Sequence, residues 1–550
     1  MAKSNGQRAL VLQGGGSLGA YEAGVFEVLY YWIKKDIDDD ENIFDIVAGT
    51  SIGAINAAFL VSYVIKKRRE EIKDVGESWK GSAEELKEFW KSRLASNINL
   101  NKWWPFSWDE KSWTLAWDIL SRINSFVATG EAARRYYSAK EFIISGASNV
   151  FLPNLPPKTD SKFFDNFIVP NIWYRYDNSR LRRSINEAIR FPIGTSHPEP
   201  RLLAISVDVE EGETVTFDSY ARKSEYGDYK PGTDRKNGTY ERTIKYDKGI
   251  MVEHILASAS VPEHYDYTLV PKEYDYTKTE EEKLEDIENY DLENYSRFWD
   301  GGVLSNTPLR ELIQSHKDYW KSVKNKPDSK NTIPKLEVYI IDIWPSVDGY
   351  PVPSDLDGIR DRKNDLTYQD VTPYDEKVAN MISDYYNLSS ALKDLAERKG
   401  VPKAEIDTIL NMPSKSSHRT GELRTYGDLV DVDERFEITK ITRIERSADR
   451  DDIANKWCDF SLGTISKLFE QGTLDALKTL AKEVMRSKSI QLREEKVKEE
   501  IMISESIQDA RTQLDLFISY AKKQGANGDL IQSAESVKAM LPVLMRSFKL

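Results

Sequence analysis

The order of segments at the start of the chain restricts the fold more than any other feature of the sequence. Two short apolar segments are each followed by a glycine-containing turn and then by a longer segment of helical character. In chain order these are Arg8–Gln13, Gly14–Ser17, residues 18–34, Ile43–Ala48, residues 49–53 and Ala54–Tyr63. Strands that alternate with helices predict a parallel sheet with helices on its faces, because each crossover helix packs back onto the sheet.

Later apolar segments extend this sheet. Further strands are predicted at Arg201–Glu210, Thr214–Phe217, Tyr240–Tyr246 and Lys335–Trp344. After Pro345 the pattern is largely helical, with one charged, alternating strand at Arg435–Glu445. We therefore expect an α/β fold with a mostly parallel central sheet flanked by helices. Residues 1–350 would form the first domain and residues 351–550 a mostly helical C-terminal region.

Two stretches have the character of insertions, at about residues 75–200 and 272–295. The first contains eight of the 13 tryptophans, at positions Trp79, Trp90, Trp103, Trp104, Trp108, Trp113, Trp117 and Trp173. The helical spacing of Trp113 and Trp117 favours a helical cap that packs over the core. The alternative is a lid or a membrane-interface patch, because Lys102–Trp108 combines a cation with aromatic rings. The second stretch is rich in Glu, Asp and Tyr and is predicted to be a solvated excursion.

Composition and charge exclude several classes of protein. The 550 residues carry a formal net charge of −13, which argues against general nucleic-acid binding. The single cysteine, Cys458, cannot form an intrachain disulfide, which fits a reducing compartment. No segment approaches the ~20 apolar residues of a transmembrane helix. We expect a cytoplasmic protein whose contact with membranes is at most peripheral, and the sequence leaves the oligomeric state open.

Ser51 lies in the pentapeptide Gly49-Thr50-Ser51-Ile52-Gly53, between a predicted strand and a predicted helix. A serine on such a turn is pushed out of the sheet with its hydroxyl exposed, and Gly49 and Gly53 permit the tight bend. The helix behind it offers free N–H groups and a positive dipole end, which favour an oxyanion. The position predicts the nucleophilic serine of a hydrolase.

The first glycine turn, Gly14-Gly15-Gly16-Ser17-Leu18-Gly19, has three interpretations. Its spacing is typical of a dinucleotide site, but such a site needs an acidic residue where the second strand ends, and Ala48-Gly49-Thr50-Ser51 supplies none. The glycines are also compatible with a plain tight turn, or with an oxyanion hole formed by converging backbone N–H groups. Because neighbouring parallel strands end at the same sheet edge, this turn is expected to face Ser51, which favours the oxyanion hole.

A serine nucleophile needs a base that accepts its proton. None of the five histidines has the sequence context of a triad partner. They are His197, His254, His264, His316 and His418. Asp300 is the better candidate, because it follows a short apolar and aromatic run and precedes Gly301 and Gly302, which leave space beside the carboxylate. By itself, Asp-Gly-Gly is more often a simple turn.

Together these pieces resemble the patatin-like phospholipase family. The resemblance covers about residues 8–345 and is carried by Gly14–Val25, Gly49–Ala57, Ala257–Pro262, Asp300–Gly302, Asn306 and Pro308. It implies a three-layer α/β/α fold with residues 1–350 as the catalytic domain, and hydrolysis of lipid acyl esters. It also implies a Ser51–Asp300 dyad without histidine and an oxyanion hole from the first glycine run. Many members carry Arg or Lys where Leu18 stands, so oxyanion stabilisation here would rest on backbone N–H groups.

The resulting hypothesis is acyl transfer through a covalent intermediate. Ser51 is the nucleophile, Asp300 is the general base, and the N–H groups of Gly14, Gly15, Gly16 and Ile52 are candidates for the oxyanion hole. We expect a phospholipase A or lysophospholipase that acts on a lipid or acyl-ester substrate. No cofactor or metal is expected, because no calcium-loop signature is present. The alternatives are a thioesterase, a transacylase, an intracellular polyester depolymerase, a non-catalytic lipid-binding scaffold or a nucleotide-binding enzyme.

Overall fold

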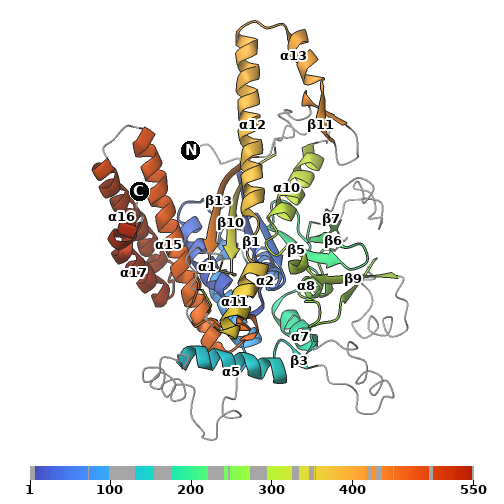
Figure 1. Ribbon diagram of the computed structural model, residues 1–550, viewed down its shortest axis with the longest axis vertical. Helices are drawn as coiled ribbons and strands as arrows, with labels where there is room; N and C mark the ends of the chain where they lie inside the picture. The colour runs from blue at the N-terminus through green and yellow to red at the C-terminus, as the bar shows by residue number, and fades with distance from the viewer. Residues whose placement is uncertain are drawn as a thin grey trace.

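The computed structural model of the chain is shown in Figure 1. It describes residues 6–71, 74–97, 130–153, 176–220, 241–245, 248–272, 294–324, 333–345, 352–353, 355–417, 423–427, 437–449, 451–494 and 499–547. A nine-stranded sheet forms the centre of the molecule and has helices on both sides. No helix in the described part of the chain has both the length and the apolar character needed to cross a membrane.

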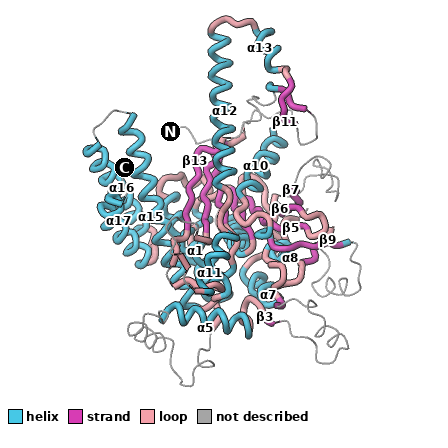
Figure 2. The backbone as a smooth tube through the Cα atoms, viewed as in Figure 1, coloured by secondary structure: helices cyan, strands magenta, loops and turns pink. Residues whose placement is uncertain are grey.

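The main path of the sheet runs β13, β10, β1, β2, β5, β6 and β7. In that order, these strands span Ile438–Glu445, Lys335–Asp342, Gly6–Leu12, Ile46–Thr50, Arg201–Asp208, Glu213–Asp218 and Glu241–Lys245. Neighbours along this path are parallel, except for the antiparallel pair β5 and β6. The predicted mostly parallel sheet is therefore confirmed, and Figure 2 shows its strands in magenta.

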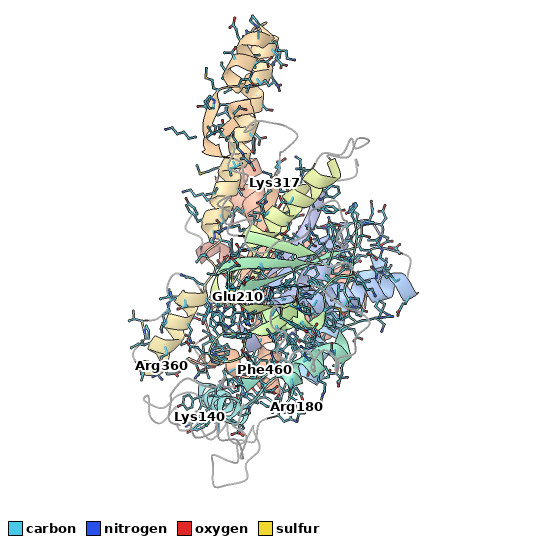
Figure 3. The ribbon with its side chains drawn as sticks, turned by 90° about the vertical axis from the view of Figure 1, so that its right-hand side faces the viewer. Lys140, Arg180, Glu210, Lys317, Arg360 and Phe460 are labelled. Carbon is cyan, nitrogen blue, oxygen red and sulfur yellow. The ribbon has the colours of Figure 1, made fainter. Side chains whose placement is uncertain are left out.

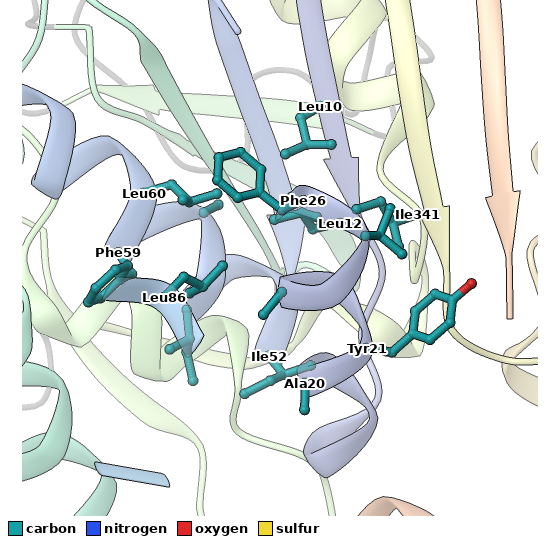
Figure 4. Packing of buried hydrophobic residues seen from close by; sticks show 14 of the residues in the cluster. Leu10, Leu12, Ala20, Tyr21, Phe26, Ile52, Phe59, Leu60, Leu86 and Ile341 are labelled. Carbon is teal, nitrogen blue, oxygen red and sulfur yellow. The ribbon is translucent and has the colours of Figure 1, made fainter. Parts of the chain in front are cut away.

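Alternating side chains on the strands create one apolar cluster on each face of the sheet. On β1, Leu10 and Leu12 belong to the first cluster, whereas Ala9 and Val11 belong to the second. The first cluster includes buried residues of α1, α2, α3 and α8, which span Ala20–Lys34, Ile52–Lys66, Ser82–Phe89 and Val252–Ser258. Its packing is shown in Figure 4. The second includes residues of α10, Leu309–Lys324, so the fold has the expected three layers.

The second strand starts later than its sequence predicts, at Ile46 instead of Ile43. The carboxylate of Asp45 accepts a hydrogen bond from the backbone N–H of Arg8 at 2.8 Å. The Arg8 guanidinium donates to the carbonyl groups of Ile43 and Asn42. These polar bonds take the place of strand pairing and make residues 43–45 a connection that leads into β2.

Only part of the predicted insertion at residues 75–200 lies within the described residues. Trp79 and Trp90 are completely buried in the first cluster, and the Trp90 indole donates to the Asn56 side chain at 2.9 Å. These two rings belong to the core, as the cap interpretation expects. The remaining tryptophans of the insertion lie outside the described residues, as do Lys102–Trp108 and most of the predicted excursion at 272–295.

The C-terminal region is largely helical, as expected, but it also completes the sheet. It contains α11, α12, α13, α15, α16 and α17, which span Leu356–Tyr368, Pro373–Arg398, Lys403–Leu410, Leu462–Glu494, Glu499–Lys523 and Gly528–Ser547. β13 from this region pairs with β10 at the edge of the sheet. The predicted boundary at residue 350 stays a prediction.

Helix α15 approaches α1 closely through two glycines. A Cβ atom added to Gly24 would lie 2.1 Å from the carbonyl oxygen of Phe469, and one added to Gly472 would lie 2.3 Å from that of Tyr21. Only glycine allows two backbones to come this near. Through this contact, α15 packs directly against α1 in the first domain.

An arm made of α12, α13 and a small hairpin projects from the body. The hairpin pairs β11, Pro413–Ser417, with β12, Leu423–Thr425. Figure 1 shows the arm at the top of the molecule, and the rotated view of Figure 3 shows that it extends beyond Lys317. The base of α12 is fixed to the body by the Arg443–Glu376 ion pair at 3.1 Å.

Candidate active site

Two strands that run in opposite directions bring Ser51 and Asp300 together. β2 pairs in parallel with β5, and its last residue, Thr50, is opposite Ile205. β9, Tyr295–Asp300, pairs antiparallel with the next residues of β5, and Asp300 is opposite Ser206. The carboxyl ends of β2 and β9 therefore meet head to head along one edge of β5. This register places the Ser51 turn beside the Asp300 turn.

Ser51 occupies a strained turn between β2 and α2. Its backbone angles are φ 57° and ψ −123°, and within the described residues only Glu263 is another non-glycine residue with positive φ. Such a conformation costs about 1–3 kcal/mol and persists only where the surroundings enforce it. The predicted exposure of the hydroxyl is modest, because Ser51 is only 8% exposed.

The flanking glycines of this turn are required by close backbone approaches. A Cβ atom on Gly49 would lie 2.2 Å from the carbonyl oxygen of Gly53, and one on Gly53 would lie 2.4 Å from that of Leu12. Both positions therefore exclude any larger residue.

Ser258 holds the serine turn from the end of α8. The Ser51 N–H donates to the Ser258 hydroxyl at 2.9 Å, and this hydroxyl donates to the carbonyl of Ile205 on β5. The sequence interpretation included Ala257–Pro262 in the family resemblance but gave no specific role to Ser258. The two residues are far apart in the sequence, so only the three-dimensional fold brings the Ser258 hydroxyl to the Ser51 N–H.

Asp300 is a buried carboxylate with few hydrogen bonds. One oxygen accepts from the N–H of Gly302 at 2.7 Å, and the other has no aligned donor among the described residues. Burial raises the pKa of Asp300 to about 7, although the Ser51 side chain and the Gly302 N–H act in the opposite direction. The Ser51 hydroxyl is close enough to lower this pKa, yet no hydrogen bond between the two side chains meets the usual limits of distance and angle.

The glycine turn after β1 passes directly against Ser51. A Cβ atom on Gly14 would lie 3.0 Å from the Ser51 Cβ. The Gly14 N–H donates to the Asn306 carbonyl at 3.2 Å, and the Asn306 side chain donates back to the Gly14 carbonyl at 3.2 Å. This reciprocal pair fixes the glycine turn to the loop that follows Asp300.

The backbone N–H groups of Gly15 and Gly16 have different surroundings from that of Gly14. Gly16 has φ +57°, and within the described part of the chain neither Gly15 nor Gly16 donates its N–H to an acceptor. The Gly14 N–H, in contrast, is committed to Asn306. Of the predicted oxyanion donors in this turn, Gly15 and Gly16 are therefore the ones with free N–H groups.

Residues from the C-terminal region form a further wall of the site. A Cβ atom on Gly16 would lie 2.4 Å from the carbonyl oxygen of Trp457, and the Ser17 hydroxyl donates to the Lys456 carbonyl at 2.8 Å. On the other side, the carbonyl of Tyr368 accepts from the Asn306 side chain at 2.9 Å. No local sequence motif marks Trp457, Lys456 or Tyr368 as part of the site, and the sequence interpretation did not identify them.

A buried ion cluster holds this C-terminal wall in place. The Lys456 ammonium lies 3.0 Å from the Asp361 carboxylate and 2.6 Å from that of Asp365, both on α11, and 3.4 Å from Asp452. Arg446 pairs with the same Asp452 at 2.7 Å. Burial raises the pKa of Asp361 to about 6, whereas Arg446 and Lys456 outweigh burial and keep the pKa of Asp452 well below its usual range.

The described histidines take no part in the Ser51 and Asp300 hydrogen bonding. Burial lowers the pKa of His254 and His316 to about 4 each, so both stay neutral in the core. The ring of His264 packs edge-on against Trp457 at 4.9 Å, and His197 packs against Trp320. His418 lies outside the described residues. In the part that the structure describes, no group of three or more His, Cys, Asp or Glu side chains is arranged to hold a metal ion.

One protein family matches a long segment of the chain. The family described as "Patatin-like phospholipase" matches residues 10–313, which is more than half of the chain. Among solved structures, VipD from Legionella pneumophila is similar over 97% of this chain and 88% of its own, with 12% sequence identity and a TM-score of 0.21. No curated protein matches the chain. The matched segment begins in β1 and ends in α10, so it includes both the Ser51 and the Asp300 turns. The chain belongs to the patatin-like phospholipase family, whose membership indicates a lipid acyl hydrolase.

Proposed function

We propose that the protein hydrolyses the carboxylic esters of phospholipids or lysophospholipids through a Ser51–Asp300 dyad. The observation that carries this proposal is the pairing of a strained serine turn with a buried carboxylate whose pKa is about 7. A general base works best when its pKa is close to the working pH. Family membership supports the lipid class of the substrate.

In the first step, the Ser51 hydroxyl oxygen attacks the ester carbonyl and Asp300 accepts its proton. The C–O bond to the leaving alcohol then breaks, and Asp300 returns the proton to that alcohol. The product is the free lysolipid or glycerol alcohol, and the acyl group remains esterified to Ser51. In the second step, Asp300 removes a proton from water, which attacks the acyl-enzyme carbonyl. The bond between the Ser51 oxygen and the acyl carbon then breaks, Asp300 returns the proton to the Ser51 oxygen, and the fatty acid leaves.

The negative charge on the carbonyl oxygen is held by backbone N–H groups. Gly15 and Gly16 supply two donors from the glycine turn, and Ile52 supplies a third from the first turn of α2, where the helix dipole adds a favourable field. Gly14 positions the turn through Asn306 and does not donate to the oxyanion. Removal of one such donor typically costs about 3 kcal/mol in the transition state.

The proposal is tested by hydrolysis of matched substrates by four full-length proteins. Wild type and the Ser51→Ala, Asp300→Asn and Ser92→Ala variants are compared on phospholipids, lysophospholipids, acyl-CoA thioesters and p-nitrophenyl esters. Ser92 is an exposed helix residue whose hydroxyl bonds only its own helix, so it is a control for the loss of a serine hydroxyl. We expect Ser51→Ala and Asp300→Asn to lose at least a thousandfold in kcat/KM and Ser92→Ala to keep its activity.

Labelling with a fluorophosphonate separates the remaining alternatives. Wild type and Ser92→Ala should react, and Ser51→Ala should not. Activity of Ser51→Ala equal to that of wild type would refute the dyad. A preference for thioesters or for acyl transfer to an alcohol would keep the dyad and change the substrate class. An unreactive wild type would support a non-catalytic scaffold.

A further inference from the structure

The projecting arm has an unusually apolar surface. Within the described residues, 12 of the 25 exposed large apolar side chains lie between Tyr374 and Tyr426. Helices α12 and α13 contain no buried residue, although both are rich in apolar side chains. Large contiguous apolar surfaces on a soluble protein usually mark an interaction site.

The apolar residues of α12 follow a heptad repeat. They alternate in steps of three and four along the helix at Tyr374, Val378, Met381, Tyr385, Leu388, Leu392 and Leu395, and the exposed Val371, two residues before the helix, continues the spacing. A period of 3.5 residues sustained over this length is the pattern of a coiled-coil seam, which requires a second helix. The seam faces away from the body, because Met381 is 61% exposed and Leu388 is 60% exposed.

The body of the protein contacts α12 mainly through its other faces. Ala379 packs against the second apolar cluster, and Asp375 and Glu376 form ion pairs with Arg310 and Arg443. These contacts anchor the base of the helix and leave the seam uncovered. Among the residues that the structure describes, no helix of the body covers the part of the seam from Tyr374 to Met381.

A groove beside the seam has room for a large side chain. It has a volume of about 470 Å³ and lies between α12, α13 and β12. Its walls include Tyr385 and Leu392 from the seam, Ile406 and Ile409 from α13, and Tyr426 beyond β12. An apolar groove between helices is a common receptor for a further helix.

We propose that two copies of this chain pair through their α12 helices in antiparallel orientation. With Val378 of one copy opposite Met381 of the other, Tyr374 falls opposite Tyr385, at the groove. Val371, two residues before the start of α12, falls opposite Leu388. Each of these apolar layers then contains one residue from each copy, as the two-fold symmetry of a dimer requires, and Leu392 and Leu395 lie beyond the paired segment.

Charge complementarity selects the second copy and this orientation. In the same register, Lys377 of each copy lies opposite Asp384 of the other, so two opposite-charge pairs flank the seam. A parallel pairing would instead bring Lys377 near Ile382 and Asp384 near Ser389, with no ion pair. Lys377 and Asp384 are both exposed on the isolated arm. The seam therefore recognises its own sequence.

The first test is the mass of the full-length protein in solution, measured by sedimentation velocity at micromolar concentration. We expect wild type to be a dimer and Leu388→Glu to be a monomer, because a charge enters an apolar layer. Asn387→Glu is the matched control, since it adds the same charge to the neighbouring exposed residue outside the seam. Circular dichroism should show the same helical content in all three proteins. A monomeric wild type, or a dimeric Leu388→Glu variant, would overturn the proposal.

The second test uses charge exchange across the seam. Lys377→Glu alone and Asp384→Lys alone each place two like-charge pairs in the dimer and should weaken it about tenfold. An equimolar mixture of the two variants should regain the wild-type affinity, because each copy then supplies the charge that the other lacks. Failure of the mixture to dimerise better than either variant would refute the antiparallel register. Flotation with phosphatidylcholine vesicles, lost in Leu388→Glu while wild type stays monomeric, would assign the seam to a lipid surface instead.

Discussion

At the scale of single residues, Asp300 and Ser51 both occupy energetically unfavourable states. Asp300 is buried with only one firm hydrogen bond, and burial raises its pKa to about 7. Ser51 has a backbone conformation that glycine adopts more easily. Active sites often combine such features, because the strained or desolvated group reacts more readily than a relaxed one.

Hydrolysis should depend on the ionisation of Asp300. Only the carboxylate form can accept the proton of Ser51, so kcat/KM should rise about tenfold per pH unit below a pKa of about 7 and level off above it. The measurement is the pH profile of kcat/KM with a p-nitrophenyl ester of constant ionisation. A flat profile down to about pH 5 would contradict the assignment of Asp300 as the base.

The free energy of unfolding should also depend on the protonation of Asp300. It should fall over the pH range in which the activity rises. The pKa of Asp300 is higher in the folded chain than its ordinary value of 3.8, so the folded state binds the proton more tightly. Its contribution to the free energy of unfolding is full below about pH 4 and is lost as the pH rises towards 7. Asp300→Asn should therefore be more stable than wild type at pH 8, by up to about 4 kcal/mol, and this advantage should shrink at low pH. Urea unfolding at several pH values measures it, and a pH-independent difference would argue against a raised pKa.

Replacement of Ser51 by glycine should separate stability from activity. Ser51→Gly removes the side chain that disfavours φ 57° and should raise the free energy of unfolding by about 1 kcal/mol. Ser51→Ala also removes the hydroxyl but keeps the Cβ atom, so it should not gain this stability. Thermal unfolding of both inactive variants provides the comparison, and equal melting temperatures would show that the turn is not strained.

At the scale of secondary-structure elements, close contacts between backbones define the geometry around the site. The α1–α15 crossing depends on Gly24 and Gly472, and the serine turn depends on Gly49 and Gly53. In each case a Cβ atom would meet another backbone at less than 2.5 Å. Backbone atoms cannot move aside as the end of a flexible side chain can, so these elements must shift as wholes when such a glycine is replaced.

The helix crossing offers a direct test. Gly24→Ala should destabilise the fold by about 3 kcal/mol, because α15 must move away from α1 and open the apolar cluster between them. Gly528→Ala is the matched control, since a Cβ atom there meets nothing within 4 Å. Urea unfolding of both variants measures the difference. A loss in Gly24→Ala no larger than in Gly528→Ala would contradict the close approach.

The sequence predicted the strands and helices near the start of the chain, but it did not predict the C-terminal residues that line the site. The β1 and β2 strands and their helices repeat a local order, and the glycines at Gly49 and Gly53 mark their turn. The roles of Ser258, Trp457 and Lys456 depend on contacts between segments far apart in the chain, and no local spacing encodes such contacts. β13 was predicted as a strand, but its place beside β10 could not be known from its own charged sequence.

At the scale of the whole molecule, the C-terminal region is packed into the sheet and against the Ser51 site. It supplies an edge strand, a helix that covers α1, and the Trp457 and Lys456 carbonyls that contact the glycine turn. The ammonium of Lys456, in turn, ties this contact to α11 through the buried carboxylates of Asp361 and Asp365. Removal of a buried partner from such a cluster is costly, because charges are then left without compensation.

Lys456→Met should therefore impair catalysis from a distance. The uncompensated carboxylates should displace residues 456–457, loosen the Gly16–Ser17 turn and lower kcat by about tenfold or more, with a smaller effect on KM. Lys522→Met, which removes an exposed ion pair with Glu535, is the control and should behave as wild type. Steady-state kinetics of both variants test this. Wild-type kcat in a folded Lys456→Met protein would show that the cluster does not support the glycine turn.

The contact between Gly16 and Trp457 also has a consequence for the time at which the protein becomes active during its synthesis. A nascent chain that already contains Ser51 and Asp300 still lacks the segment that presses against the glycine turn, because Trp457 is translated much later. Contacts between such distant parts of a chain form slowly and only after both parts are available. A ribosome-bound fragment would therefore carry both members of the proposed dyad without the segment that presses against the proposed oxyanion hole. We expect hydrolysis to begin only after residues 456–457 have left the ribosome.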